Sequence, residues 1–467
     1  MSAATPSDPA ASSAPDCVDV LIAGAGPTGL STALALAPLG LRVRLVDPQD
    51  AATLADPPPD GRELALTHRT EALLRDWGVW ERLPDAARAP LLAAAVSTGG
   101  QAASLHLDAS HARAPRPFPF PLPPLPPLPP LPPFPRLPVP PILRDLIGPG
   151  APGAASAERL GTLVSQNALR RALWQRCAEF PGHITVSDRT RLEDFRRDAD
   201  GVTVQLVGPD GPQQVRAALL VAADGRLSGA RRMAGLVADL HDFGRSAIVG
   251  RLRHTRPHGA VAREAFHLGH TLAVLPLVDA PDDGTGQPRH QSSFVVTAPS
   301  ELARQWMAQP IEDYARTVAG WLGGQLGDLV PAPGDASRRH LYPLVATWAP
   351  RLVSDRVALV GDAAVGMHPV TAHGFNLGLY SAETLARQIQ ARAQGGVVPD
   401  PADPVALAAY DREHRDTARW IFHGTNAIVR LFTDDRPVAR RVRQATLHLA
   451  ERLPPVKALI VRQLVDA

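Results

Sequence analysis

The chain has 467 residues, a formal net charge of +2 and hydrophobic residues at 45% of its positions, a length that allows two or three domains with a large core. Nearly all of its cations are arginine, and Lys457 is the only lysine, which argues against chemistry that needs a Schiff-base or phosphate-loop lysine. Together with the excess of Ala and Pro, the arginines are typical of a GC-rich genome and do not indicate a nucleic-acid partner.

The two cysteines, Cys17 and Cys177, are too few for a disulfide framework or a zinc site. We therefore expect no metal site and a cytoplasmic location. Residues 1–16 are rich in Ala, Ser and Pro and lack the basic and apolar regions of a signal peptide, so we expect a disordered tail. No apolar run reaches the ~18 residues that a membrane span requires, so any membrane contact would be peripheral.

The first predicted elements form a unit of strand, glycine-rich turn, helix and strand. A strand over residues 17–23 is followed by Gly24-Ala-Gly-Pro-Thr-Gly29, a helix over 30–39 and a second strand over 41–46 that ends at Asp47. Small glycines let a pyrophosphate approach the N-terminus of a helix, and an acid about 20 residues further on can accept hydrogen bonds from a ribose. FAD and NAD both fit this pattern, and a tight turn without a ligand is the alternative.

Arg62 follows, in a loop that leads into a predicted helix ending near Trp77. Its side chain can reach a cofactor phosphate or ring, although an arginine in a loop is more often a solvated charge or half of an ion pair.

Residues 115–141 are dominated by proline, with Leu-Pro-Pro units between Leu122 and Leu131. Because proline fixes φ and removes donors, this segment is predicted to be polyproline II, with every repeated leucine on one face and a stripe on the order of 45 Å long. The favoured interpretation is a low-complexity insertion. The alternative is a ligand for an adapter domain, or a hydrophobic rib that faces a membrane or partner.

The middle of the chain predicts a helix over 160–176, capped by Ser165 or Asn167, and then strands over 184–186, 202–207 and 219–223. The last of these strands ends in Asp224-Gly225. A further buried strand, 357–360, ends in Gly361-Asp362 and leads through a glycine-containing loop into a helix. Three buried strands therefore end in glycine or Gly/Asp turns. Because ligands bind outside the carboxyl ends of strands in an open α/β sheet, we predict a site where these turns converge.

The remaining segments complete an α/β (α+β) architecture. Residues 246–296 are rich in predicted strands, 300–323 are helical, and 381–467 form helices interrupted by Pro437 and by Pro454-Pro455. The predicted organisation is a discontinuous Rossmann-like dinucleotide-binding domain (17–110, 158–240 and 350–400), a proline-rich insertion (111–157), a substrate-binding β-sheet domain (241–349) and a C-terminal helical region (401–467).

Three ordered motifs carry a family resemblance: Gly24-Ala-Gly-Pro-Thr-Gly29, Ala222-Ala-Asp-Gly-Arg-Leu-Ser-Gly-Ala-Arg231 and Arg356-Val-Ala-Leu-Val-Gly-Asp-Ala-Ala-Val365. From Cys17 onward, the chain resembles the single-component FAD-dependent aromatic hydroxylases of the p-hydroxybenzoate hydroxylase fold, and among them the ubiquinone-biosynthesis hydroxylases. The stretches 423–435 and 452–457 are similar to the bacterial demethoxyubiquinol hydroxylase branch.

The resemblance implies that FAD lies extended across the three motifs. Asp224 would serve both FAD and NAD(P)H, Asp362 would hold the ribityl chain, and backbone N–H groups of the loop from Pro369 would stabilise negative charge on the reduced flavin. The residues that the resemblance assigns to cofactor binding are Gly24, Gly26, Gly29, Asp47, Arg62, Gln166, Asp224, Gly225, Gly361, Asp362, Pro369, Gly374, Phe375 and Asn376.

The implied reaction begins with reduction of FAD by NAD(P)H. Oxygen then adds to the flavin, and the hydroperoxide transfers one oxygen to the ring of a polyprenylated phenol or quinol. His368 and His373 flank the flavin loop and can handle a phenol proton, with a packing role as the alternative. Many relatives have His in place of Val365 and Gln in place of His373, so substrate preference can differ here.

Three further interpretations stay open. The enzyme can act on a different aromatic compound, from secondary metabolism or catabolism. A flavin halogenase is disfavoured because the chain has no Trp-x-Trp pair. A flavin-fold scaffold with a proline-rich interaction rib is the non-enzymatic alternative. The arginine-rich helices around 440–453 can bind an anionic lipid surface, which would place the protein at the periphery of the inner membrane or in a quinone-biosynthesis complex. The alternative is that they form a solvated outer face.

Overall fold

The computed structural model describes residues 16–98, 105–112, 158–282, 284, 286–368, 374–393 and 397–433, and, further on, 436, 443, 446–447, 450–453, 457–458 and 460–461. Several predictions fall outside these residues. They concern the N-terminal tail up to residue 15, the proline-rich segment 115–141, the loop with Pro369 and His373, and much of the chain beyond 433.

The first sheet is built around parallel, fully buried strands. Its order is β18-β19-β11-β1-β2-β8, and β10 and β9 extend it from β11. Near-continuous apolar runs such as Val20 to Ile22 and Leu219 to Ala222 suit strands that are covered on both faces. The strands are β1 (Asp16–Ala23), β2 (Val43–Val46), β8 (Ile184–Ser187), β9 (Arg191–Arg197), β10 (Val202–Gly208), β11 (Gly211–Ala222), β18 (Val353–Ser354) and β19 (Val357–Leu359).

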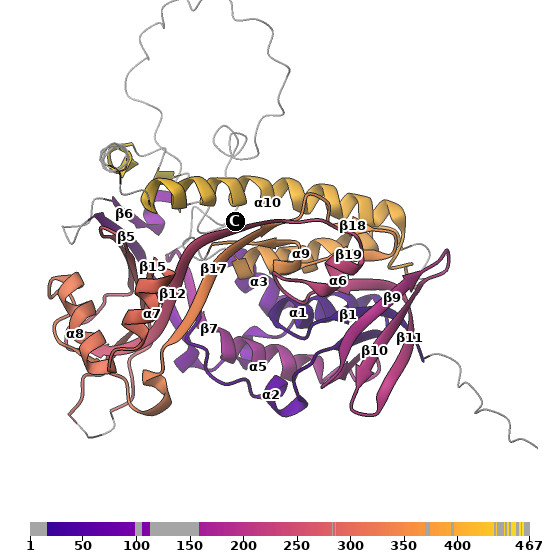
Figure 1. The fold of residues 1–467 in the computed structure, drawn as a ribbon, viewed down its shortest axis with the longest axis horizontal. Helices are drawn as coiled ribbons and strands as arrows, with labels where there is room; N and C mark the ends of the chain where they lie inside the picture. Colours follow the sequence, from indigo (N-terminus) through magenta and orange to yellow (C-terminus); the bar gives the residue numbers. More distant parts are fainter. Residues whose placement is uncertain are drawn as a thin grey trace, which may run out of the picture.

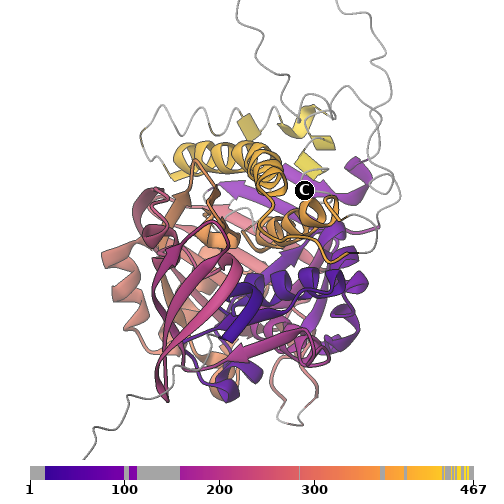
Figure 2. The ribbon, with the colours of Figure 1, turned by 90° about the vertical axis from the view of Figure 1, so that its right-hand side faces the viewer.

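Helices cover this sheet and one another. Helix α1 packs against α5 and α9, and α10 packs on the outside of α9, as Figures 1 and 2 show. The hydroxyl of the fully buried Tyr410 in α10 donates to the backbone oxygen of Leu359 at 2.5 Å, which ties this outer helix to β19. The α-helices around the sheet are α1 (Pro27–Leu36), α2 (Ala51–Ala55), α3 (His68–Asp76), α5 (Gln166–Cys177), α6 (Gly229–Met233), α9 (Gly374–Gln390) and α10 (Pro404–Thr433).

The second sheet has nine strands in the order β20-β17-β12-β15-β14-β13-β5-β6, with β16 paired to β12. In Figure 1 it lies to the left with α7 and α8, and β12 and β17 run across toward the first sheet. Its strands and helices are β5 (Ala93–Thr98), β6 (Leu105–Asp108), β12 (Asp239–His254), β13 (Val261–Phe266), β14 (Thr271–Pro276), β15 (His290–Pro299), α7 (Ser300–Met307), α8 (Ile311–Leu322), β16 (Leu329–Pro331), β17 (His340–Trp348) and β20 (Val365–Gly366).

The two faces of this sheet differ because side chains alternate along each strand. On one face Ile248, Leu272, Phe294 and Val296 form a core with α7 and α8. The opposite face carries mostly small residues and lines a cavity, which is described below. The same strands thus provide a hydrophobic core and a wall for a ligand.

A third, three-stranded sheet corrects one prediction. Residues 160–165, predicted to begin a helix, form strand β7 (Gly161–Ser165) between β3 (Glu63–Leu66) and β4 (Arg88–Leu91). Gly161 has a φ of +158°, and a Cβ there would lie 2.3 Å from the backbone oxygen of Leu66. The β-branched Thr162 and Val164 suit the strand. The helix starts only at Gln166, with Ser165 at the N-cap position.

Most other predicted elements are confirmed, with small shifts at their ends. Helix α1 starts at Pro27, the second strand starts at Val43, and the helical region 300–323 is divided at Pro310. Short 3₁₀ helices occupy Ala37–Leu39, Trp80–Arg82, Asp85–Ala87, Ala109–Ala112, Gly334–Ser337 and Gly361–Ala363. The α/β (α+β) class is confirmed, while the domain boundaries remain a prediction.

A small cluster joins the C-terminal stretch to the second sheet. Leu447, Ala450 and Val461 are buried with Leu105 and Phe266. Nearby, the backbone N–H of His106 donates to the carboxylate of Glu451 at 2.9 Å, and the same carboxylate pairs with Lys457 at 2.7 Å. The described part of this stretch therefore packs its apolar side chains on β6.

Candidate active site

The carboxyl ends of β1, β11 and β19 meet at one edge of the first sheet, because these strands are parallel neighbours. A cavity of about 920 Å³ lies there and extends to the second sheet. The predicted convergence of the three turns is confirmed. The predicted site residues that line the cavity are Gly24, Gly26, Asp47, Arg62, Gln166, Asp224, Gly225, Asp362, His368, Gly374 and Phe375. Gly29, Gly361 and Asn376 lie behind this lining, and Pro369 and His373 are outside the described residues.

The glycines of the first turn have different structural roles. A Cβ on Gly24, which has a φ of +105°, would lie 2.6 Å from the backbone oxygen of Ala223, and one on Gly29 would lie 1.9 Å from the oxygen of Gly24. A Cβ on Gly26 would meet nothing within 4 Å. Gly26 is the N-cap residue of α1, and no side chain caps this helix. The turn therefore offers space and backbone N–H groups to an anion.

Asp47, at the end of β2, holds the glycine turn in place. Its carboxylate accepts hydrogen bonds from the backbone N–H groups of Ala25, at 2.8 Å, and Gln49, at 2.9 Å. A carboxylate has about four acceptor positions, so it retains the capacity to accept a ligand hydroxyl. The side chain thus has a structural role in addition to the predicted ribose contact.

Arg62 and Gln166 are brought together by Asp60, which the sequence analysis did not single out. The carboxylate of Asp60 accepts from Nη2 of Arg62 at 2.6 Å and from Nε2 of Gln166 at 3.2 Å. The guanidinium of Arg62 also lies 5.1 Å from the ring centroid of Tyr342, whose hydroxyl donates to the backbone oxygen of Asp60. Three distant segments therefore meet at this side of the cavity.

Asp362 is held by an arginine from the second motif. Nε of Arg226 donates to Oδ2 of Asp362 at 2.7 Å, and Nη1 of Arg226 donates to the backbone oxygen of Val345 at 2.8 Å. Both side chains line the cavity and are about one-third exposed. Arg226 belongs to the Asp-Gly-Arg motif, so its place in the sequence was a usable signal that the prediction left out.

The neighbouring residues of the second motif fasten this turn to the third motif. The carboxylate of Asp224 accepts from the hydroxyl of Ser228 and from the backbone N–H of Ala230, at the start of α6. The buried Arg231 donates to the backbone oxygens of Ala363, at 2.8 Å, and Arg226, at 3.0 Å. These contacts fix the relative positions of Asp224 and Asp362.

Helix α9 directs its N-terminus, Gly374 and Phe375, at the cavity. Oδ1 of the buried Asn376 accepts from the backbone N–H of Thr67 at 3.3 Å, and its Nδ2 donates to the backbone oxygen of Ala65 at 2.8 Å. Asn376 therefore joins α9 to β3. The predicted cofactor residue Gly361 also supports the fold, because a Cβ there would lie 2.8 Å from Oγ1 of Thr28 in α1.

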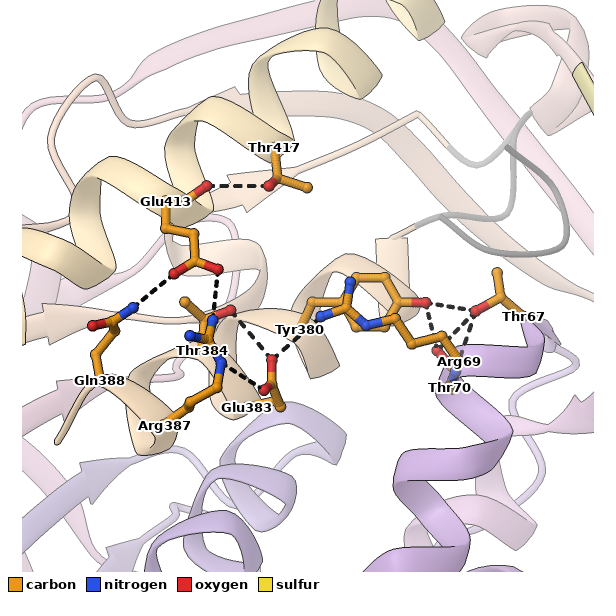
Figure 3. Close-up of polar contacts among 10 residues, drawn as sticks. All are labelled: Thr67, Arg69, Thr70, Tyr380, Glu383, Thr384, Arg387, Gln388, Glu413 and Thr417. Atoms are coloured by element: carbon orange, nitrogen blue, oxygen red, sulfur yellow. Dashed lines mark hydrogen bonds and ion pairs between the residues drawn. The ribbon is translucent and has the colours of Figure 1, made fainter. Parts of the chain in front are cut away.

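A polar network further along α9 fixes this helix between α3 and α10 (Figure 3). The hydroxyl of Tyr380 is hydrogen-bonded to the hydroxyls of Thr67, at 2.5 Å, and Thr70, at 3.2 Å. Arg387 bridges Glu383, at 3.0 Å within α9, and Glu413, at 2.5 Å in α10. The end of α9 that borders the cavity is thus positioned by contacts made more than one turn away.

His368 is buried at the cavity wall, with 5% of its surface exposed. Its ring contacts Phe243 edge to face, with centroids 5.0 Å apart. Burial, aided by the positive charges of Arg226 and Arg245, lowers the pKa of His368 to about 4. The imidazole is therefore neutral near pH 7, and the predicted catalytic role of His368 remains a prediction.

The second sheet contributes the apolar wall of the cavity through Ala247, Val249, Ala273 and Val295, together with Thr271 and Thr297. Two acids also line the cavity and were not predicted. Glu63 is paired with Arg251 at 2.5 Å, and burial, partly opposed by that arginine, raises its pKa to about 7. Burial raises the pKa of Glu264 to about 8. An acid within an otherwise strand-like segment was the signal in the sequence.

None of the helices in the described ranges has both the length and the apolar character that a membrane crossing requires. In the same ranges, His, Cys, Asp and Glu form no group of three or more that is arranged to hold a metal ion.

Comparison with known proteins gives a consistent result. A family model described as an FAD binding domain matches residues 17–425. The ubiquinone hydroxylase UbiM of Neisseria meningitidis is 34% identical over 446 residues, covering 96% of this chain and 84% of that protein. UbiL of Rhodospirillum rubrum, also named a ubiquinone hydroxylase, is 32% identical and covers 97% and 91%. The 3-demethoxyubiquinol 3-hydroxylase of Escherichia coli is 24% identical, covering 94% of this chain and 96% of that protein.

Solved structures share the fold at lower sequence identity. The p-nitrophenol 4-monooxygenase PnpA of Pseudomonas putida matches with a TM-score of 0.67 at 19% identity, covering 96% of this chain and 98% of its own. The anhydrotetracycline hydroxylase OxyS of Streptomyces rimosus matches with a TM-score of 0.62 at 22% identity, covering 97% of this chain and 76% of its own.

Proposed function

The chain belongs to the FAD-binding family that includes the ubiquinone hydroxylases UbiM and UbiL, and from this premise we propose that it is an FAD-dependent monooxygenase which hydroxylates the ring of a polyprenylated phenol or quinol in ubiquinone biosynthesis. One observation supports this most directly. A single cavity runs from the glycine turn of the first sheet to the apolar wall of the second, so a cofactor and an aromatic substrate can occupy it together.

The residues present fit FAD. A Cβ on Gly26, Gly225 or Gly374 would meet nothing within 4 Å, so the backbone at these positions leaves space for a ligand along the cavity. Gly26 and the N-terminus of α1 would hold the pyrophosphate, and Asp47 would accept hydrogen bonds from the ribose. Asp362, fixed by Arg226, would hold the ribityl chain, with Arg62 and Gln166 as further contacts.

When bound, FAD supplies the redox chemistry, taking electrons from NAD(P)H and activating oxygen for insertion of one atom into the ring. The protein contributes orientation, exclusion of water and electrostatics. The N-terminus of α9, at Gly374 and Phe375, would place backbone N–H groups and the positive end of the helix dipole toward a ring system that becomes anionic on reduction. The small residues of β12, β14 and β15 would receive the substrate ring.

The experiment is a reconstitution with purified protein. We expect bound FAD, NAD(P)H oxidation that rises on addition of a prenylated demethoxyquinol, and a product that has gained one oxygen atom by mass analysis. Absence of flavin after gentle purification and FAD addition would contradict the proposal. Equal stimulation by unprenylated aromatic compounds would instead favour an aromatic hydroxylase of another pathway. Quinone intermediates that accumulate in a strain lacking the protein would identify the step.

We further infer peripheral contact with an anionic membrane surface, because a polyprenylated substrate partitions into the bilayer. The arginine-rich stretch 440–453 supports this interpretation. Among its described residues, Leu447 and Ala450 are packed against the protein, whereas Arg452 is exposed. Lipid contact would therefore come from arginine side chains and not from this apolar face.

A further inference from the structure

Glu264 occupies a central position on the cavity face of the second sheet. It lies on β13, directly opposite Ala273 of β14, which in turn is opposite Val295 of β15 and, through it, Val249 of β12. These four residues form one cross-strand row, and all of them line the cavity. Glu264 is thus the only acid in a row of small apolar side chains.

The carboxyl group of Glu264 has no counter-charge in the part of the chain that the structure describes. No hydrogen bond or ion pair is found to it there, in contrast to Glu63, which is paired with Arg251. The residues facing it on the two paired strands are Ala273 and Val96, and neither titrates. The adjacent Arg263 donates instead to the backbone oxygens of His258 and Val261.

Glu264 is half-buried among apolar side chains at the cavity wall, so the charged form of its carboxyl group is disfavoured. The same burial raises its pKa to about 8. The pKa of a phenol is about 10, so it exceeds the pKa of Glu264 by about two, compared with roughly six for an ordinary glutamate. A base is most effective when its pKa lies near the working pH, so the environment of Glu264 suits a base that acts on a weak ring acid.

We propose that Glu264 binds the ring hydroxyl of the substrate and accepts its proton. The hydroxyl O–H bond breaks, a new O–H bond forms on a carboxylate oxygen of Glu264, and no electrons are transferred. The ring oxygen becomes more electron-donating, which prepares the ring for attack by an electrophilic oxygen. This inference rests on the proposed function, since it takes the substrate to be a hydroxylated ring that lies against Ala273 and Val295.

Ligand binding tests the contact without turnover. The probes are a phenol with a short prenyl chain and its methyl ether, which has no proton to donate, and the readout is the perturbation of flavin absorbance in the holoenzyme. Above about pH 8, where the carboxyl group of Glu264 is ionised, we expect the wild-type protein to prefer the phenol by roughly tenfold, as for a hydrogen bond to a charged group. Glu264→Leu should abolish that preference and leave the affinity for the methyl ether unchanged. Glu301→Gln, an exposed acid at the start of α7, is the matched control.

The pH dependence tests the proton transfer. For hydroxylation of the same phenol, kcat/KM of the wild type should rise with pH through about 8, because only the ionised acid accepts a proton. Glu264→Gln keeps the shape and a hydrogen bond but cannot titrate, so this rise of kcat/KM with pH should disappear, whereas the control Glu301→Gln should retain it. The inference would be overturned if kcat/KM of Glu264→Gln still rose with pH through about 8, or if Glu264→Leu kept the preference for the phenol.

These outcomes are distinguishable from failure of the proposed function. A wild-type protein that binds the phenol with a preference that depends on Glu264, yet forms no hydroxylated product, would refute the activity and retain the contact. A protein that hydroxylates the ring equally well with and without Glu264 would retain the proposed activity and refute the role of Glu264. A wild-type holoenzyme that binds no phenol would refute both.

Discussion

Glycine has two separate roles in the turn between β1 and α1, and each can be tested with a single methyl group. Gly26→Ala places a Cβ toward the cavity, and the φ of −70° at this position suits alanine. We expect a folded protein with unchanged thermal stability whose FAD affinity falls by roughly tenfold, about 1.4 kcal/mol. Flavin fluorescence titration and differential scanning fluorimetry measure the two quantities.

Gly29→Ala is the matched comparison. Its Cβ would lie 1.9 Å from the backbone oxygen of Gly24, so we expect loss of folding stability by more than about 2 kcal/mol, even in protein without flavin. If Gly26→Ala unfolds the protein, or if Gly29→Ala is as stable as the wild type, the assignment of the two roles is wrong.

At the scale of single residues, the sequence predicted which motif residues lie at the cavity better than it predicted what each of them contacts. The motif positions Asp47, Asp224 and Asp362 line the cavity as expected. Gly361 and Asn376, whose contact with the cofactor stays a prediction, also support helix packing, because their neighbours Thr28 and Thr67 come from distant segments. Such a distinction depends on tertiary contacts, which no local pattern contains.

At the scale of elements, α9 is the part that connects the cavity to the outer layers. Its buried Tyr380 hydroxyl contacts two threonines of the α3 cap (Figure 3). Tyr380→Phe removes this hydroxyl and leaves the ring in place, so we expect the free energy of unfolding to fall by about 1 kcal/mol, measured by urea denaturation. Thr417→Ala, in the same network but on the exposed side of α10, should change it by less than about 0.5 kcal/mol. Equal effects of the two substitutions would contradict this account.

The error at residues 160–165 has a physical origin at the same scale. The run from Gly161 to Ser165 is short and fully buried, and such a run fits a buried strand or a buried helix equally well by periodicity. Pairing with β3 and β4 determines the outcome. Those partners are separated from β7 along the chain by the proline-rich segment, so nothing near Gly161 in the sequence indicates them.

At the scale of the whole molecule, the convergence of three turns was predictable because parallel neighbours share one edge. The pairing of β5 with β13 was not, since it joins residues near 95 to residues near 264 in parallel register. As a result, the sequence predicted where a cofactor would bind but not that Glu264 faces the same cavity. The role of the proline-rich segment remains a prediction.

The proposed membrane contact would also be a property of the whole molecule, and liposome flotation measures it. We expect the full chain to float with anionic vesicles and to be released as salt rises, because screening at 0.1 M acts over about 10 Å. Arg440→Gln combined with Arg441→Gln should weaken flotation. Arg304→Gln with Arg316→Gln, two exposed arginines on α7 and α8, should not. Flotation that is insensitive to salt, or equal with neutral vesicles, would count against an arginine-mediated contact.

The alternation of side chains in the second sheet has an evolutionary consequence. Ile248, Leu272 and Phe294 hold α7 and α8 in place, whereas Ala247, Ala273 and Val295 on the same strands face the cavity. Cavity-facing residues of β12, β14 and β15 can therefore be exchanged without disturbing the core beneath α7 and α8. Selection for stability and selection for a new substrate would then act on opposite faces of the same sheet.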